Sequence, residues 1–83
     1  MLCPIYTNQF KKDLKHQQRR GKDMQKIKDV MTLLSANQEL PARLRDHSLR
    51  GEFKDFKECH IESDWLLIYK MTENNIYFTR RIL

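Results

Sequence analysis

The chain lacks the features that mark several large protein classes. It has no apolar run near the roughly 18 residues that a membrane-spanning helix needs, and its two glycines form no glycine-rich phosphate loop. Its N-terminus has no basic segment followed by a long apolar one, so we expect no signal peptide and a cytoplasmic location. Its only cysteines, Cys3 and Cys59, lie far apart without Cys-x-x-Cys spacing. This spacing favours two free thiols over a disulfide.

Positive charge is the feature that the chain has in excess. Sixteen basic and eleven acidic residues give a net charge of +5 in 83 residues. Such an excess favours a polyanionic partner, either a nucleic acid or an acidic protein, without choosing between the two. The length allows one compact domain, and an apolar content of 40% is typical of a folded one.

The first half of the sequence predicts a strand followed by two helices. Residues 2–6 are short and mostly apolar, and Pro4 within them suits an edge strand or the start of a strand. Apolar residues at helical spacing indicate helices over residues 9–19 and 23–36, and Gly21 suits the left-handed turn between them. The residues expected to cap these helices are Thr7 or Asn8 for the first and Asp23 for the second.

The second half predicts a loop and an antiparallel meander. Residues 37–51 have no periodicity, which indicates a loop whose length is itself typical of a functional segment. Strands are expected over residues 53–61, 65–71 and 76–82. The order β-α-α-β-β-β predicts an α+β fold in which a helical hairpin packs on one face of a small antiparallel sheet.

Polar residues suited to phosphodiester chemistry gather in this second half. His47 lies in the loop, His60 near a strand end, Asp64 just before the central strand and Arg80 on the last strand. Because the outer strands flank the central one, we expect these side chains to converge on one sheet face. Histidines can remove the ribose 2′-OH proton and protonate the leaving oxygen, while an arginine stabilises charge on the phosphate. A metal site from the two histidines and Asp64 is disfavoured, because their spacing matches no standard zinc motif.

Each candidate also has a plain structural interpretation. His47 in a loop is more often exposed than catalytic, His60 is more often a hydrogen-bonded structural residue, and Asp64 can cap a turn. The ring of Trp65 is more often a core side chain than a platform for stacking bases. Phenylalanines 53 and 56 with nearby lysines can form an RNA-binding ribbon or a half-buried strand. The candidate RNA contacts are Trp65, Lys54, Lys57 and Arg81.

Two segments of this region resemble the YafQ branch of the RelE toxin superfamily. Residues 45–51, RDHSLRG, match its DH-x-L-x-G pattern. Residues 57–70, KECHIESDWLLIYK, match a second family pattern, in which a histidine is followed by three residues, Asp-Trp and an apolar run that ends in tyrosine. Residues 22–34 are similar to the family's second helix, so the resemblance covers almost the whole chain.

The resemblance implies a RelE-like toxin of a type II toxin–antitoxin system that cleaves messenger RNA on the ribosome. A DinJ- or RelB-like antitoxin would hold it inactive, and DNA would be contacted only through that complex. We expect no cofactor, metal or membrane partner. By matching position, the resemblance implies catalytic roles for His47, His60, Asp64 and Arg80, with Arg81 as the alternative arginine. It places Trp65 beside the site.

The family pattern also implies a difference at the end of the chain. It continues past the arginine with a Gly-Ser/Thr-His segment and a terminal Leu-Phe, whereas this sequence stops at Leu83. We therefore expect one toxin domain over residues 1–83 that lacks the last catalytic histidine and cleaves RNA more weakly. The alternative is a catalytically impaired or truncated form that only binds an antitoxin or the ribosome, or regulates its operon.

Overall fold

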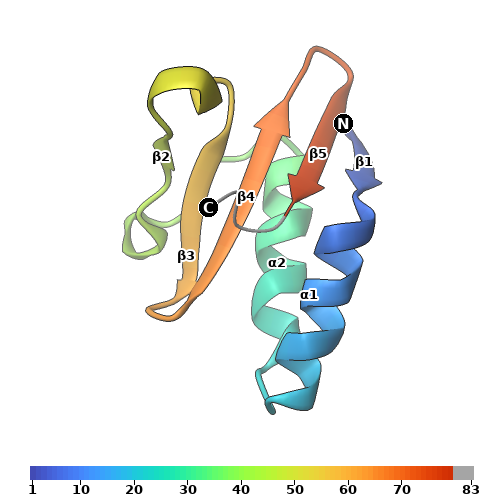
Figure 1. Cartoon of the computed structure of the whole chain (residues 1–83). Coiled ribbons are helices and arrows are strands. Elements are labelled where there is room, and N and C mark those ends of the chain that lie inside the picture. The colour runs from blue at the N-terminus through green and yellow to red at the C-terminus, as the bar shows by residue number, and fades with distance from the viewer. Residues whose placement is uncertain (80–83) are drawn as a thin grey trace.

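The computed structural model describes residues 1–79, in which two helices pack on one face of a five-stranded mixed sheet (Figure 1). The elements are β1 (Cys3–Tyr6), α1 (Asn8–Arg19), α2 (Met24–Ser35), η1 (Ala42–Leu44), β2 (His47–Ser48), η2 (Gly51–Phe53), β3 (Lys57–Glu62), β4 (Trp65–Met71) and β5 (Asn75–Thr79). The strand order is β1-β5-β4-β3-β2. The predicted α+β architecture with a helical hairpin on a sheet is confirmed.

The two edges of the sheet differ from the prediction. β1 pairs in parallel with β5, so the sheet is mixed rather than wholly antiparallel. As expected from Pro4, which has no backbone N–H to donate, β1 is an edge strand. At the other edge, the segment predicted as a loop contains η1 and the two-residue strand β2, which pairs with β3. A strand of two residues is too short to produce a periodic pattern.

Two strand boundaries also differ from those expected. The strand predicted from residue 53 begins at Lys57, because the chain first makes the turn of η2. Gly51 starts that turn with a φ of +68°, which a glycine adopts without steric cost. The last strand is described as far as Thr79, and its predicted continuation to Ile82 lies outside the described residues.

The helix ends follow the predicted capping chemistry. Thr7 caps α1, because its Oγ1 accepts a hydrogen bond from the backbone N–H of Phe10 at 3.1 Å. The Asp23 carboxylate caps α2 in the same way, accepting from the N–H of Gln25 at 3.0 Å. Gly21 lies between the helices with a φ of +81°, the left-handed conformation expected after a helix end.

The hydrophobic core fills the space between the helices and one face of the sheet. Residues paired across antiparallel strands share a face. Cys59 and its partner Leu67 therefore face the helices, and both are buried. The buried residues of this core are Phe10, Ile27, Val30, Leu34, Leu44, Cys59, Ile61, Trp65, Leu67, Tyr69, Ile76 and Phe78. Within residues 1–79, no helix covers the opposite face, which carries Glu58 and His60.

The two cysteines are both free thiols, as predicted. Cys3 is exposed and Cys59 is buried, and burial raises the pKa of the Cys59 thiol to about 12. A thiol with so high a pKa stays protonated at neutral pH and is a poor nucleophile or metal ligand. Within residues 1–79, neither helix has the length and apolar character needed to cross a bilayer.

Candidate functional site

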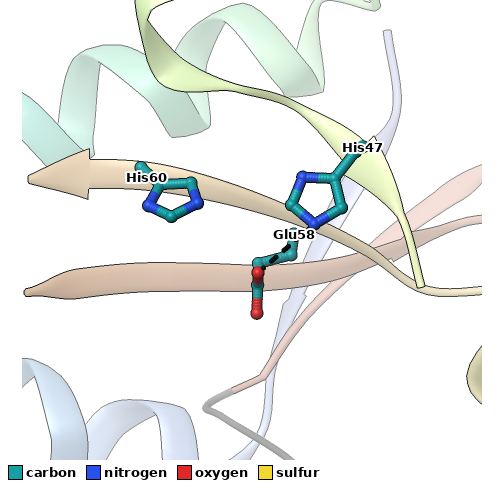
Figure 2. A group of neighbouring side chains, drawn as sticks. All are labelled: His47, Glu58 and His60. Atoms are coloured by element: carbon teal, nitrogen blue, oxygen red, sulfur yellow. Dashed lines mark ion pairs between the residues drawn. The ribbon is translucent and has the colours of Figure 1, made fainter. Parts of the chain in front are cut away.

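His47, Glu58 and His60 form a cluster on the sheet face opposite the helices (Figure 2). His47 on β2 is paired in register with Glu58 on β3, and His60 lies two residues further along β3 on the same face. The Nε2 atom of His47 is 3.4 Å from Oε1 of Glu58. The two imidazole ring centres are 6.2 Å apart. The sheet thus brings together the two histidines singled out in the sequence, with a glutamate that was not.

The backbone before β2 sets the orientation of the His47 ring. Arg45 has a φ of +50°, a left-handed conformation that is uncommon for a residue other than glycine. Its carbonyl oxygen lies 2.7 Å from Nδ1 of His47. A carbonyl can only accept a hydrogen bond, so Nδ1 carries the proton that it donates. In the neutral ring, Nε2 is therefore the atom with a free lone pair, and it faces Glu58.

Asp46, the residue before His47, is held by the central strand. The Tyr69 hydroxyl on β4 donates a hydrogen bond to Oδ1 of Asp46, and Nζ of Lys57 lies 3.2 Å from Oδ2. The Tyr69 side chain is 1% exposed. Burial and the Asp46 carboxylate raise the pKa of Tyr69 far above its usual value, so its hydroxyl remains a donor. This bond fixes the start of β2 against the core.

Asp64, the predicted carboxylate of the site, is paired with the turn between the helices. It lies between β3 and β4, where Nζ of Lys22 donates to Oδ1 at 2.9 Å and Arg20 donates to Oδ2 at 3.3 Å. Lys22 also donates to Glu62 at 2.9 Å, so one ammonium bridges two carboxylates. The hydrogen bond from Lys22 lowers the pKa of Asp64, which stays ionised.

The residues predicted to contact RNA differ in how far they are exposed to solvent. Trp65 is a core residue with 2% of its surface exposed, so its ring is not available to stack on a base and that expectation does not fit the structure. Lys54 is exposed just after η2. Lys57 lies on β3, where its ammonium is partly neutralised by Asp46. Arg80 and Arg81 lie outside the described residues.

Glu58 is the residue of this cluster that the sequence did not single out. The alternation along β3 placed it on the same face as His60, and this pattern was its only trace in the sequence. Its position opposite His47 depends on the pairing of β2 with β3, and β2 was not predicted. The side chain it contributes is a carboxylate in reach of an imidazole, which can orient the ring and stabilise its protonated form.

Comparison with known proteins places these observations in a family. Residues 3–82 match the family model described as a bacterial toxin of type II toxin–antitoxin system, YafQ. The mRNA interferase toxin YafQ of Escherichia coli K12 is 47% identical over 76 residues, which cover 90% of this chain and 83% of that protein. The crystal structure of the E. coli DinJ–YafQ toxin–antitoxin complex matches with a TM-score of 0.88 and 45% identity, over 95% of this chain and 88% of the other. The structure of a metal-bound toxin from Helicobacter pylori matches with a TM-score of 0.89 and 36% identity, over 96% and 91%.

Proposed function

Because the chain belongs to the YafQ family of bacterial toxins of type II toxin–antitoxin systems, we propose that it is an mRNA interferase, an endoribonuclease that cuts messenger RNA on the ribosome in the cytoplasm. The observation that carries this proposal is the pair of histidines, His47 and His60, on the sheet face that no helix of the described residues covers. Two imidazoles at one site supply both proton transfers that RNA cleavage requires. The name of the E. coli relative supports the same activity.

In the proposed reaction, the ribose 2′-oxygen attacks the adjacent phosphorus and the 5′-oxygen of the next nucleotide leaves. One imidazole accepts the 2′-OH proton and the other donates a proton to the leaving oxygen, so the products are a 2′,3′-cyclic phosphate and a 5′-hydroxyl. Ring centres 6.2 Å apart are close enough for one phosphodiester to contact both rings. Closely placed acid and base groups of this kind typically contribute about 10²- to 10⁴-fold to a rate.

The hydrogen bonds around His47 favour the role of base for this residue. Its Nδ1 donates to the Arg45 carbonyl, which leaves Nε2 free to accept the proton. The imidazolium that forms then faces the Glu58 carboxylate, 3.4 Å from Nε2, which stabilises its charge. His60 is left as the acid. Glu58 is a positioning residue in this scheme, because it acts through His47.

The family pattern adds two further residues to the proposed site. Arg80 would stabilise the charge that develops on the phosphate, with Arg81 as the alternative. Asp64 would contribute a second carboxylate, kept ionised by the hydrogen bond from Lys22. Lys54 is exposed and provides positive charge for the RNA backbone.

An antitoxin is the partner that the structural match to the DinJ–YafQ complex supports. We propose that a DinJ- or RelB-like antitoxin keeps this chain inactive and that ribosomes and messenger RNA are its targets. The net charge of +5 is consistent with both kinds of partner, because it complements RNA and an acidic protein segment alike.

A ribosome-dependent cleavage assay tests the proposal. His60→Gln should reduce cleavage by about 10²- to 10⁴-fold, because the leaving oxygen loses its proton donor. The matched control is His16→Gln, which changes an exposed histidine on α1 and should leave cleavage unchanged. Both variants should keep the melting temperature of the parent. Full activity in folded His60→Gln would mean that the site is misplaced. A parent that binds an antitoxin but cleaves nothing would support the impaired homologue instead.

A further inference from the structure

An open hollow with two arginines on its wall lies beside His60, between η1 and the end of β3. Its volume is about 360 Å³, and it is lined by Arg43, Leu44, Arg45, His60, Ile61, Glu62 and Ser63. Ligand sites in proteins measure roughly 300–1,000 Å³, so the hollow suits a group no larger than one nucleotide. Neither His47 nor Glu58 lines it. The hollow therefore extends the candidate site past His60.

The turn of η1 brings the two arginines to the hollow. The backbone N–H of Leu44 donates to the Pro41 carbonyl at 3.0 Å, and that of Arg45 donates to the Ala42 carbonyl at 3.1 Å. Leu44 is 6% exposed and anchors the turn in the core. Its neighbours in sequence, Arg43 and Arg45, are exposed and both line the hollow. One buried leucine thus fixes the backbone positions from which both guanidinium groups extend.

The hollow carries an excess of positive charge. No carboxylate among residues 1–79 pairs with the guanidinium group of Arg43 or Arg45. The carboxylate that lines the hollow, Glu62, is already paired, because Nζ of Lys22 lies 2.9 Å from Oε1 and Nζ of Lys26 lies 3.3 Å from Oε2. Two ammonium groups offset its charge, so it does not neutralise the arginines. Guanidinium groups with N–H donors available in this way favour a phosphate.

The proposed reaction determines which part of the RNA reaches the hollow. In that scheme His60 is the acid, so it faces the leaving 5′-oxygen of the downstream nucleotide. That nucleotide continues through its ribose to a phosphate of its own on the 3′ side. Since His60 and the two arginines line the same hollow, this second phosphate is the group that can reach Arg43 and Arg45. Each guanidinium offers several N–H donors in a fork that matches phosphate oxygens.

We propose that Arg43 and Arg45 bind the first phosphate on the 3′ side of the scissile one, so that RNA crosses the site from His47 past His60 into the hollow. The direction rests on the proposed function, because it follows from the role of His60 as the acid. The presence of a phosphate site rests on the hollow and its arginines alone. With both contacts made, the downstream nucleotide is held by both of its phosphates.

Binding of a short RNA that cannot be cleaved tests the site apart from catalysis. The probe is a uridine dinucleotide whose attacking 2′-oxygen is methylated, with and without a 3′-terminal phosphate. At low salt the 3′-phosphate should tighten binding to the parent by about threefold or more, as exposed ion pairs can. Arg43→Gln and Arg45→Gln should lose most of this gain. The matched control Arg50→Gln changes an exposed arginine outside the hollow and should keep it. An equal gain in all four proteins would overturn the proposal.

Nuclear magnetic resonance of the parent protein tests the same site without a mutation in it. The backbone amide signals of Arg45 and Ser63 should shift more with the 3′-phosphorylated dinucleotide than with the unphosphorylated one. The amide signal of Arg50 should respond equally to both. The absence of any extra shift at Arg45 and Ser63 would overturn the site. This measurement also decides the question if the arginine variants do not fold.

The same dinucleotide with a 5′-terminal phosphate in place of the 3′-terminal one tests the direction. This phosphate lies on the upstream side, so any gain in affinity that it gives should be the same in the parent and in Arg45→Gln. A gain from the 5′-phosphate that Arg45→Gln removes would overturn the direction and the role of His60 as the acid. It would still support a phosphate site in the hollow.

Ribosome-dependent cleavage tests whether the contact serves the proposed function. The double variant of Arg43→Gln and Arg45→Gln should raise KM severalfold and change kcat little, because the contact is made in the ground state and the transition state alike. Arg45→Lys, which keeps the charge, should raise KM less than Arg45→Gln does. Unchanged KM in the double variant would overturn a role in cleavage.

Two further outcomes separate this proposal from its neighbours. A double variant that binds RNA as the parent does, yet loses an acidic antitoxin segment, would make the hollow a protein-docking site and would overturn the proposal. A parent that shows the gain from the 3′-phosphate but never cleaves RNA would refute the proposed function, and with it the direction, and would leave the phosphate site supported.

Discussion

Tyr69→Phe should destabilise the domain, because it removes the hydroxyl that holds Asp46. The ring stays in the core, where Tyr69 is 1% exposed, so packing is preserved. A hydrogen bond to a charged group contributes about 1.5–3 kcal/mol. Asp46 keeps Lys57 at 3.2 Å and its side chain is 25% exposed, so water replaces part of the loss. We therefore expect the lower end of this range, about 1.5 kcal/mol. For a domain of this size the melting temperature should fall by about 6–12 °C.

The same change should also affect the site, because Asp46 directly precedes His47. A looser start of β2 displaces the imidazole, and a misplacement of about 1 Å can cost up to about 10²-fold in rate. Thermal melts followed by circular dichroism give the stability, and the cleavage assay gives the rate. Tyr6→Phe is the matched control, since its exposed hydroxyl donates to no group among the described residues. Equal melting temperatures for the two variants would refute the reasoning. The reasoning would also be refuted if Tyr69→Phe lowered the melting temperature as much in an Asp46→Asn background as in the parent.

Two further predictions concern the ion pairs and the core. Asp64→Asn should lower the melting temperature slightly at neutral pH, because Lys22 and Arg20 lose an ionised partner that is 52% exposed. The pKa of Asp64 is lowered from its ordinary 3.8, so the higher melting temperature of the parent should be present above pH 3.8 and should disappear as the pH falls below it. A difference in melting temperature between parent and variant that is constant with pH would contradict this. Ile27→Ala should cost about 2–5 kcal/mol in urea unfolding, because Ile27 is fully buried against the sheet and the change leaves a cavity. A loss below about 1 kcal/mol would show that the core closes over the gap.

The helices and central strands could be predicted because each has a local pattern. The apolar spacing along residues 24–35 and the continuous apolar run along residues 65–71 are visible without knowledge of the fold. The parallel pairing of β1 with β5 joins residues more than 70 positions apart, such as Cys3 and Asn75. No local pattern records such a pairing. The late start of β3 was missed for a related reason, because phenylalanines 53 and 56 fit a strand pattern although the chain turns there.

The candidate site was predictable only in part, because sequence identifies chemical groups and pairing determines which of them meet. His47 and His60 were found from their chemistry and from the family pattern. In the sequence, Glu58 cannot be distinguished from other charged residues on the solvent-facing side of a strand. The pairing of β2 with β3 is what places it opposite His47. Asp64 was chosen for its position before Trp65, yet its nearest cations come from the helical turn some 42 residues earlier in the chain. The carboxylate indicated by the sequence was Asp64, and the strand register adds Glu58 beside the two histidines. No spacing in the sequence displays this arrangement, because it depends on the register between β2 and β3.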